Sequence, residues 1–206
     1  MVWVWTAMAW LSGSLMFSYW LGLLSRRNIR EVGDGNPGGV NLLKAAGVGW
    51  GLTGIALDFL KGYAPMALLL WNGSVTGYEI VPVAIAPVLG HAFSPFLKFH
   101  GGKAIAVTFG VWSALTSFEV SVVYALILAV MLIADRTLRR VRTSLPESDA
   151  VQIVLGMLFV FIYLYAMGFS APYLWCWLGN YAVLLCTHRR EISLFLGRVA
   201  ALRGHH

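Results

Sequence analysis

Charged residues are scarce in this chain. Asp, Glu, Lys and Arg make up 12% of its 206 residues, whereas apolar residues make up 59%. Soluble domains carry about twice that share of charge, and such a composition would leave large apolar areas facing water. Lipid is therefore the expected solvent, and we predict an all-α integral membrane protein with a single polytopic domain over residues 1–206.

Cysteine is almost absent. The two cysteines, Cys176 and Cys186, lie ten residues apart in one apolar run, which on a helix places them about 15 Å apart. That distance excludes a disulfide. No carboxylate or cysteine lies at metal-ligand spacing from His91 or His100, so we expect neither a metal nor another cofactor.

Signals of nucleotide and nucleic-acid chemistry are also missing. The net charge of +6 comes from basic residues scattered between apolar runs, not from a continuous patch, so nucleic acid is not an expected partner. No Walker motif or dinucleotide fingerprint is present. The N-terminus lacks the basic region of a secretory signal, so the first apolar segment is expected to stay as a transmembrane helix.

Seven apolar stretches are long enough to cross a membrane as helices, alone or as part of a helical hairpin. The polar residues 116–119 divide one long stretch into two short helices, and residues 144–149, around Pro146, are expected to form a solvated turn. The predicted spans are residues 2–24, 47–71 and 80–97, two helices within 104–134, and residues 151–168 and 171–186.

The basic residues predict the orientation of these spans. All but one of the 15 lie in the loops after the first, third and fifth spans or in the C-terminal tail. The positive-inside rule then places the N-terminus outside and the C-terminus in the cytoplasm, which requires an odd number of spans. We therefore expect a multi-pass protein of the inner (plasma) membrane with its functional loops on the cytoplasmic side.

The first inner loop is rich in glycine. Four glycines within residues 33–39 allow positive φ and close approach of the backbone to a ligand, and successive N–H groups in such a loop can form an anion-binding nest. Two asparagines and two flanking cations favour ligand binding over a flexible connector. The residues concerned are Gly33, Gly35, Gly38 and Gly39, with Asn36, Asn41, Arg30 and Lys44.

The second segment places two charges inside a span. Asp58 and Lys61 are i, i+3 on a helix and can therefore pair. Because a charge in a span is costly, both should point into the bundle or a wet cavity. One interpretation is a salt bridge that orients the helices; the other is that Lys61 neutralises a substrate phosphate while Asp58 positions it.

The third segment, residues 90–104, contains Gly101-Gly102-Lys103 directly before an apolar helix. Free N–H groups and the positive end of the helix dipole at that point should form an anion site, strengthened by the lysine. His91 is either a core histidine or part of this site. The fold prediction includes re-entrant or half-helix segments around these cytoplasmic loops.

The last segment lies at the inner end of the seventh span. Residues 187–191 read Thr-His-Arg-Arg-Glu, which alone is an ordinary positive-inside flank. The final Gly204-His205-His206 is given no functional weight.

Together the four segments resemble the PlsY-type acyl-phosphate:glycerol-3-phosphate acyltransferases, small bacterial membrane enzymes with seven spans. The resemblance runs from about Arg26 to Ile192. Residues 33–41 are similar to the family's Gly-Ser-Gly-Asn-x-Gly-x-Thr-Asn loop, and residues 57–62 match its Leu-Asp-x-x-Lys-Gly element in full. Residues 90–108 follow its Gly-His…Lys-Gly-Gly-Lys…Thr stretch in outline, and residues 187–192 its Arg-His-x-x-Asn-Ile ending.

The chain departs from the family pattern at several positions. A carboxylate in place of the loop serine would repel phosphate unless a cation lies beside it, and lysine in place of arginine loses bidentate phosphate geometry. The departures are Asp34 for serine, Val40 for threonine, Lys44 for arginine, His100 for lysine, Ala104 for glycine and Glu191 for asparagine.

The resemblance implies transfer of a fatty acyl group from acyl phosphate to the 1-hydroxyl of glycerol 3-phosphate, in phospholipid biosynthesis. The donor is already activated, so positioning and charge neutralisation can supply most of the acceleration. No oligomer is required, and the acyl chain would lie between helices, reached laterally from the inner leaflet. Alternatives are an enzyme of the same fold acting on another phosphorylated polyol, or a small membrane transporter.

The resemblance also implies roles for individual residues. Gly101, Gly102 and Lys103 would hold one phosphate, and His188 would bind phosphate or polarise the hydroxyl. The expected catalytic residues are His188, Lys103 and Asn36; the expected substrate-binding residues are Gly33, Asp34, Gly35, Gly38, Asn41, Lys44, Asp58, Lys61, His91, Gly101, Gly102 and Arg189.

Overall fold

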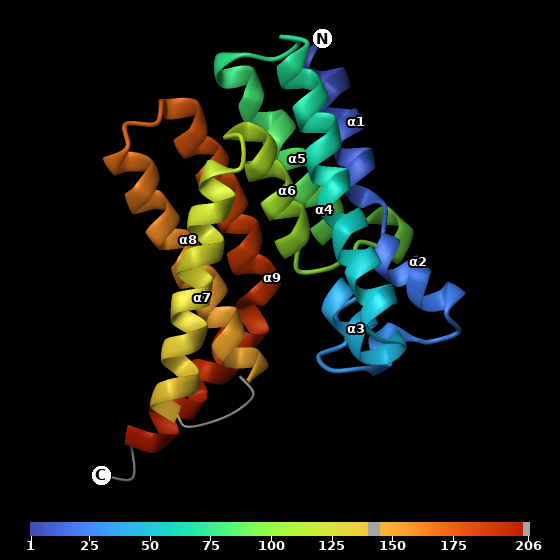
Figure 1. Cartoon of the computed structure of the whole chain (residues 1–206), viewed down its shortest axis with the longest axis vertical. Helices are drawn as coiled ribbons and strands as arrows, with labels where there is room; N and C mark the ends of the chain where they lie inside the picture. Colours follow the sequence, from blue (N-terminus) through green and yellow to red (C-terminus); the bar gives the residue numbers. More distant parts are fainter. Residues whose placement is uncertain (140–144, 204–206) are drawn as a thin grey trace.

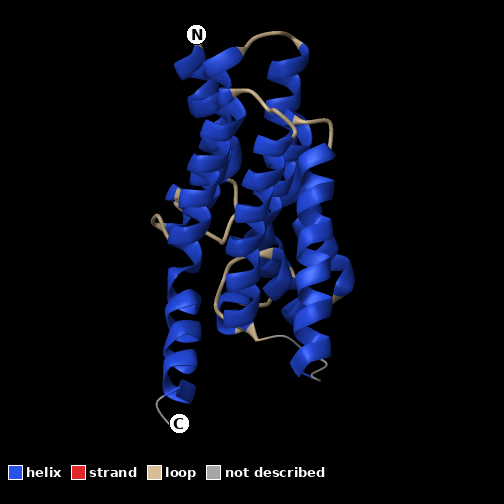
Figure 2. Cartoon of the chain, turned by 90° about the vertical axis from the view of Figure 1, so that its left-hand side faces the viewer, coloured by secondary structure: helices blue, strands red, loops and turns tan. Residues whose placement is uncertain are grey.

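The computed structural model describes residues 1–139 and 145–203, and every regular element within them is a helix (Figures 1 and 2). The α-helices are α1 (Val2–Ser14), α2 (Phe17–Leu24), α3 (Gly39–Ala46), α4 (Val48–Trp71), α5 (Ile80–Ala92), α6 (Ile105–Leu115), α7 (Glu119–Arg139), α8 (Pro146–Ala166) and α9 (Ala171–Arg203). Three 3₁₀ turns lie between them: η1 (Ile29–Glu31), η2 (Gly77–Glu79) and η3 (Pro95–Leu97). The two termini lie at opposite ends of the long axis (Figure 1).

The described helices have the length and composition of membrane spans. Five stretches are long and apolar enough to cross a bilayer: Val2–Leu24, Val48–Trp71, Gly77–Leu97, Glu119–Leu138 and Pro146–Ala166. Helix α6 is apolar but has only 11 residues, so it is about 16 Å long against a hydrocarbon core of about 30 Å. The prediction of an all-helical membrane protein is confirmed, and α6 is a half-helix whose N-cap, Ala104, is buried.

The sequence predicted one continuous helix for the first span, but the structure divides this span into two helices. Helix α1 ends at Ser14 and α2 begins at Phe17, with Leu15 in an extended conformation. Two of the carbonyls freed by this break have side-chain partners: Ser94 Oγ donates to Ser14 O at 2.7 Å, and Lys61 Nζ donates to Leu15 O. Because non-helical backbone is tolerated at membrane depth only when its polar groups are satisfied, these contacts allow the break.

Two further expectations are corrected. The helices within residues 104–134 are not both short, since α7 has 21 residues. Residues 145–149 do not form a solvated turn: Pro146 stands in the first turn of α8, where its missing N–H costs nothing, and Ser148 is buried. Ser144, Arg140, Arg142 and the final Gly204-His205-His206 lie outside the described residues.

Small residues allow the helices to approach closely. A Cβ on Gly110 of α6 would collide with the backbone of Phe59 on α4, and one on Gly90 of α5 with the backbone of Trp10 on α1. Such contacts replace the hydrophobic effect as the source of helix association in lipid. Helix α9 packs on both α5 and α8 and so connects the two groups of helices visible in Figure 1.

Candidate active site

The glycine-rich loop folds around the carboxylate of Asp34. Gly33 and Gly35 have φ of 60° and 75°, and Asp34 Oδ1 accepts the Asn36 N–H at 3.1 Å and Asn41 Nδ2 at 2.8 Å. The loop therefore encloses an anion, as a nest would, but that anion is the chain's own side chain. Position 33 also requires a residue without a Cβ, because a Cβ there would collide with the Asn41 side chain.

Lys103 lies beside this loop. Its ammonium is 2.6 Å from Asp34 Oδ2 and 3.0 Å from Glu191 Oε1 on α9, and its N–H donates to Asn36 Oδ1 at 3.1 Å. Burial raises the pKa of Asp34, but the hydrogen bond and charge of Lys103, with the bonds from Asn36 and Asn41, outweigh it, so this pKa is lowered. The cation that a carboxylate in a phosphate loop requires is therefore present.

The N–H groups of Gly101 and Gly102 are not free to bind an anion, and that expectation was wrong. They donate to the carbonyls of Ala92 and His91 at 3.1 Å each, so they fasten the loop to the end of α5. A Cβ at Gly101 would collide with the His91 carbonyl, and one at Gly102 with the His91 ring. The glycines are needed for this packing.

The anion-binding end of α6 lies one step further along the chain. Ala104 is its N-cap, with φ of 60°, in the left-handed region that favours glycine. The first bond of the helix runs from Thr108 N to Ala104 O, so the N–H groups of Ile105, Ala106 and Val107 have no partner within the helix. These donors and the helix dipole favour negative charge next to Lys103.

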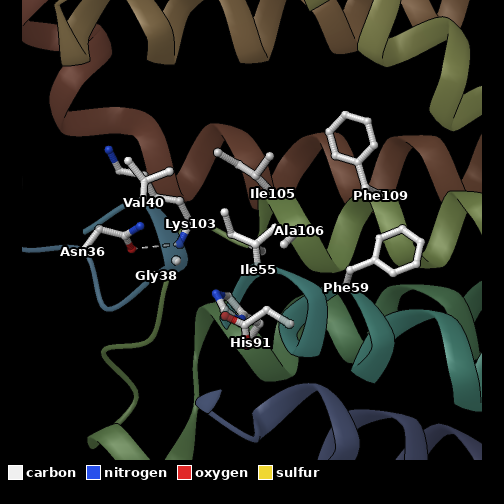
Figure 3. Close-up of a pocket in the computed structure, with 13 residues that line it drawn as sticks. Asn36, Gly38, Val40, Ile55, Phe59, His91, Lys103, Ile105, Ala106 and Phe109 are labelled. Atoms are coloured by element: carbon white, nitrogen blue, oxygen red, sulfur yellow. Dashed lines mark hydrogen bonds between the residues drawn. The ribbon is translucent and has the colours of Figure 1, made fainter. Parts of the chain in front are cut away.

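Three cavities meet at Asn36 and Lys103, which line all of them. The first is apolar, has a volume of about 400 Å³ and runs between α4 and α6. Figure 3 shows Asn36 and Lys103 at one end of it and the rings of Phe59 and Phe109 at the other. It is lined by Asn36, Gly38, Gly39, Val40, Ile55, Asp58, Phe59, His91, Lys103, Ala104, Ile105, Ala106 and Phe109.

The other two cavities are more polar than the first, because charged and amide side chains line them. The smaller, of about 170 Å³, contains Asn41, Lys44, Asp149 and His188 among its lining residues. The larger, of about 550 Å³, is lined by the glycine loops and by a group of cationic and polar side chains that includes Arg30, His100, Arg189 and Arg190. An apolar cavity joined to two polar ones suits a substrate with an acyl chain and a charged head.

His188 is held in one orientation. It has no exposed surface, and its Nδ1 lies 2.8 Å from the carbonyl oxygen of Leu184. A carbonyl only accepts, so Nδ1 carries the proton and Nε2 presents a lone pair. Among the described residues Nε2 has no hydrogen-bond partner, although His188 lines the smaller polar cavity. The site therefore contains an acceptor suited to a substrate hydroxyl.

Asp58 and Lys61 pair as the sequence predicted. Lys61 Nζ is 2.9 Å from Asp58 Oδ1, and their side chains are 1% and 2% exposed. Asp58 lines the apolar cavity, as does His91, whereas Lys61 is not among the residues that line the cavities described above. With its ammonium bound to Asp58 and to the Leu15 carbonyl, Lys61 fastens α4 to the break in the first span.

The structure brings the remaining predicted residues together. Gly33 lines a fourth cavity of about 230 Å³ beside Asp34. Arg30, predicted as a cation that flanks the glycine loop, lines the larger cavity; its guanidinium donates to the His100 carbonyl at 2.9 Å and lies over the Tyr19 ring. The sequence analysis did not assign Arg190 and Asp149 to the site, although both are lining residues. Arg190 directly follows the predicted Arg189, and that proximity is the signal that could have identified it.

Comparison with known proteins identifies the family of this chain. Residues 3–197 match the family described as glycerol-3-phosphate acyltransferase. Glycerol-3-phosphate acyltransferase 1 of Thermotoga maritima is 40% identical over 190 residues, covering 90% of this chain and 93% of that protein. The glycerol-3-phosphate acyltransferase of Aquifex aeolicus is 29% identical over 188 residues, covering 91% and 92%.

Solved structures agree with the sequence relatives. The crystal structure of PlsY, an integral membrane glycerol 3-phosphate acyltransferase, superposes in its glycerol 3-phosphate form with a TM-score of 0.81 at 26% identity, covering 96% of this chain and 93% of that one. The lysophosphatidic acid form gives a TM-score of 0.79 with the same identity and coverage. The chain therefore belongs to the glycerol-3-phosphate acyltransferase family of integral membrane enzymes.

Proposed function

We propose that this membrane acyltransferase takes its acyl group from acyl phosphate and transfers it to the 1-hydroxyl of glycerol 3-phosphate, releasing lysophosphatidate and inorganic phosphate. The observation that carries the proposal is the meeting of one apolar and two polar cavities at Asn36 and Lys103. The donor carbonyl would lie at this junction, with its chain in the apolar cavity. Solved relatives in forms named for glycerol 3-phosphate and lysophosphatidic acid support this acceptor and product.

Each cavity then has one role. The acceptor would occupy the smaller polar cavity, with its phosphate on Lys44 and its hydroxyl on His188 Nε2. The donor phosphate would lie at Lys103 and the first turn of α6, and it would leave through the larger cavity past Arg30 and Arg189. Lys61 would serve the fold, through its pair with Asp58 and the Leu15 carbonyl.

The reaction is a single acyl transfer. The acceptor oxygen attacks the carbonyl carbon and forms the new ester, and the bond from that carbon to the phosphate oxygen breaks. His188 accepts the hydroxyl proton, which is returned to the released phosphate. Lys103 and the free N–H groups of α6 stabilise negative charge as it moves from the carbonyl to the phosphate, so the chain supplies positioning and electrostatics without a covalent nucleophile.

The topology is part of the proposal. Seven crossings in one polytopic domain would comprise the five long apolar stretches, the half-helix α6 and α9. The opposite positions of the termini support an odd number. With 14 of the 15 basic residues in alternate loops and the tail, the N-terminus would lie outside and the active site at the cytoplasmic face of the inner membrane.

Purified protein mixed with acyl phosphate and glycerol 3-phosphate tests the proposal. We expect inorganic phosphate and lysophosphatidate in equal amounts. Absence of both, under conditions in which the Thermotoga maritima relative works, would refute it. Because Asp34 and Glu191 depart from the family pattern, a panel of other phosphorylated polyols tests the acceptor. Uptake of glycerol 3-phosphate by proteoliposomes without product would indicate a transporter instead.

Filling the apolar cavity should impair use of long acyl chains. Ala106 lines it on the first turn of α6, and we expect Ala106→Trp to lower kcat/KM for hexadecanoyl phosphate about tenfold, because the indole occupies space that the chain needs. Acetyl phosphate should be affected much less. The matched control is Ala125→Trp on the exposed face of α7. An equal loss of kcat/KM with both donors would mean that the cavity does not hold the acyl chain.

A further inference from the structure

Glu191 contacts Lys103, the lysine to which the proposed function assigns the donor phosphate. Lys103 Nζ contacts two carboxylates, at 2.6 Å in Asp34 and 3.0 Å in Glu191. One positive charge held by two negative ones leaves this point with a net negative charge, whereas the reaction requires it to receive a phosphate. A substrate phosphate can bind Lys103 well only if one carboxylate moves away or is displaced.

The two carboxylates are held differently. Both oxygens of Asp34 are in use, because Oδ1 accepts from Asn36 and Asn41 while Oδ2 contacts Lys103. Glu191 contacts Lys103 through Oε1 alone, and its Oε2 is buried with no hydrogen-bond partner in the described part of the chain. Displacing Glu191 therefore breaks one ion pair, whereas displacing Asp34 would also undo the glycine loop.

Glu191 also has space to move into. It lines the larger polar cavity on one side and the cavity of about 230 Å³ on the other, whose other lining residues are Gly33, Asp34, Pro146, Glu147, Arg190 and Leu194. The carboxylates of Asp34 and Glu147 are paired there with Lys103 and Arg198. Rotation of its side chain toward Arg190 would clear Lys103 without moving the backbone of α9. The neighbouring guanidinium would then compensate the displaced carboxylate.

We infer that Glu191 is a specificity-determining residue that occupies the phosphate position of Lys103 in the free enzyme and turns away when the phosphate of acyl phosphate, or the released phosphate, binds there. The inference rests on the proposed function for its substrate. It explains why a carboxylate is compatible with the site: the carboxylate orients Lys103, and it weakens the hold on product phosphate.

Glu191→Gln tests the inference, because the amide keeps the shape and loses the charge. We expect KM for acyl phosphate and Ki for inorganic phosphate to fall together, about 3- to 10-fold, without a rise in kcat, since the released phosphate is also held more tightly. Glu191→Asn is the second variant, should the first fold poorly. Glu79→Gln, at an exposed position in η2 far from Lys103 along the chain, is the matched control and should change neither constant.

Calorimetric titration with inorganic phosphate separates this inference from the proposed function, because it needs no turnover. Tighter phosphate binding by Glu191→Gln than by wild type supports the inference even if acyl transfer is not found. Unchanged or weaker phosphate binding in both Glu191 variants, with Glu79→Gln behaving as wild type, would overturn it. A lower Ki that is accompanied by an unchanged KM for acyl phosphate would also overturn it.

Discussion

Lys103→Ala is expected to lower kcat/KM about 10²- to 10³-fold, the loss typical of removing one preorganised electrostatic group from an active site. The reason extends beyond one missing contact. Lys103 separates the carboxylates of Asp34 and Glu191, so its removal leaves two negative charges facing the incoming phosphate. The loss should therefore appear in both KM and kcat, measured as phosphate release from acyl phosphate at saturating glycerol 3-phosphate.

Lys98→Ala is the matched control, since Lys98 lies in the same segment with an exposed side chain and contacts neither carboxylate. It should retain activity within about twofold. The double variant Lys103→Ala with Glu191→Gln should recover part of the lost affinity by removing one repelling charge. Retention of more than a tenth of the wild-type activity by Lys103→Ala in folded protein would contradict the placement of the reacting phosphate at this lysine.

The convergence of the four polar segments could be predicted from sequence because their residue types are all suited to binding an anion. Glycines, amides and cations at the inner ends of apolar spans indicate an anion site at a membrane surface. The structure brings Asn36 and Lys103, which are 67 positions apart, into a direct hydrogen bond. Hydropathy predicted the long spans for the same reason, since backbone in lipid must be helical.

The details that were not predicted depend on partners distant in sequence. Gly101 and Gly102 could donate to a ligand or to the protein, and only the end of α5 decides that they donate to His91 and Ala92. The break after Ser14 lies in a stretch without proline, and its carbonyls are satisfied by Ser94 and Lys61. Periodicity within one segment carries no information about these contacts.

Asp58→Ala is expected to destabilise the fold by about 3 to 5 kcal/mol, because it leaves the ammonium of Lys61 buried without a countercharge. Asp58 also accepts a hydrogen bond from Ser18 Oγ at 2.5 Å, so the substitution also removes a contact between α4 and α2. For a domain of this size we expect the apparent Tm in detergent to fall by about 10 °C, measured by thermal unfolding of the purified protein.

The double variant Asp58→Leu with Lys61→Met separates charge from packing. Replacing a buried ion pair by apolar side chains of similar volume is often neutral, so the double variant should recover most of the lost Tm, less the contribution of the hydrogen bond to the Leu15 carbonyl. Ser18→Ala, which removes one hydrogen bond to the Asp58 carboxylate and leaves the ion pair in place, should cost about 2 kcal/mol. A double variant as unstable as Asp58→Ala would mean that the stability lies in the bonds to Ser18 and Leu15 and not in the ion pair. Since the pair joins α4 to the broken span, a double variant that regains its Tm should regain acyl transfer as well.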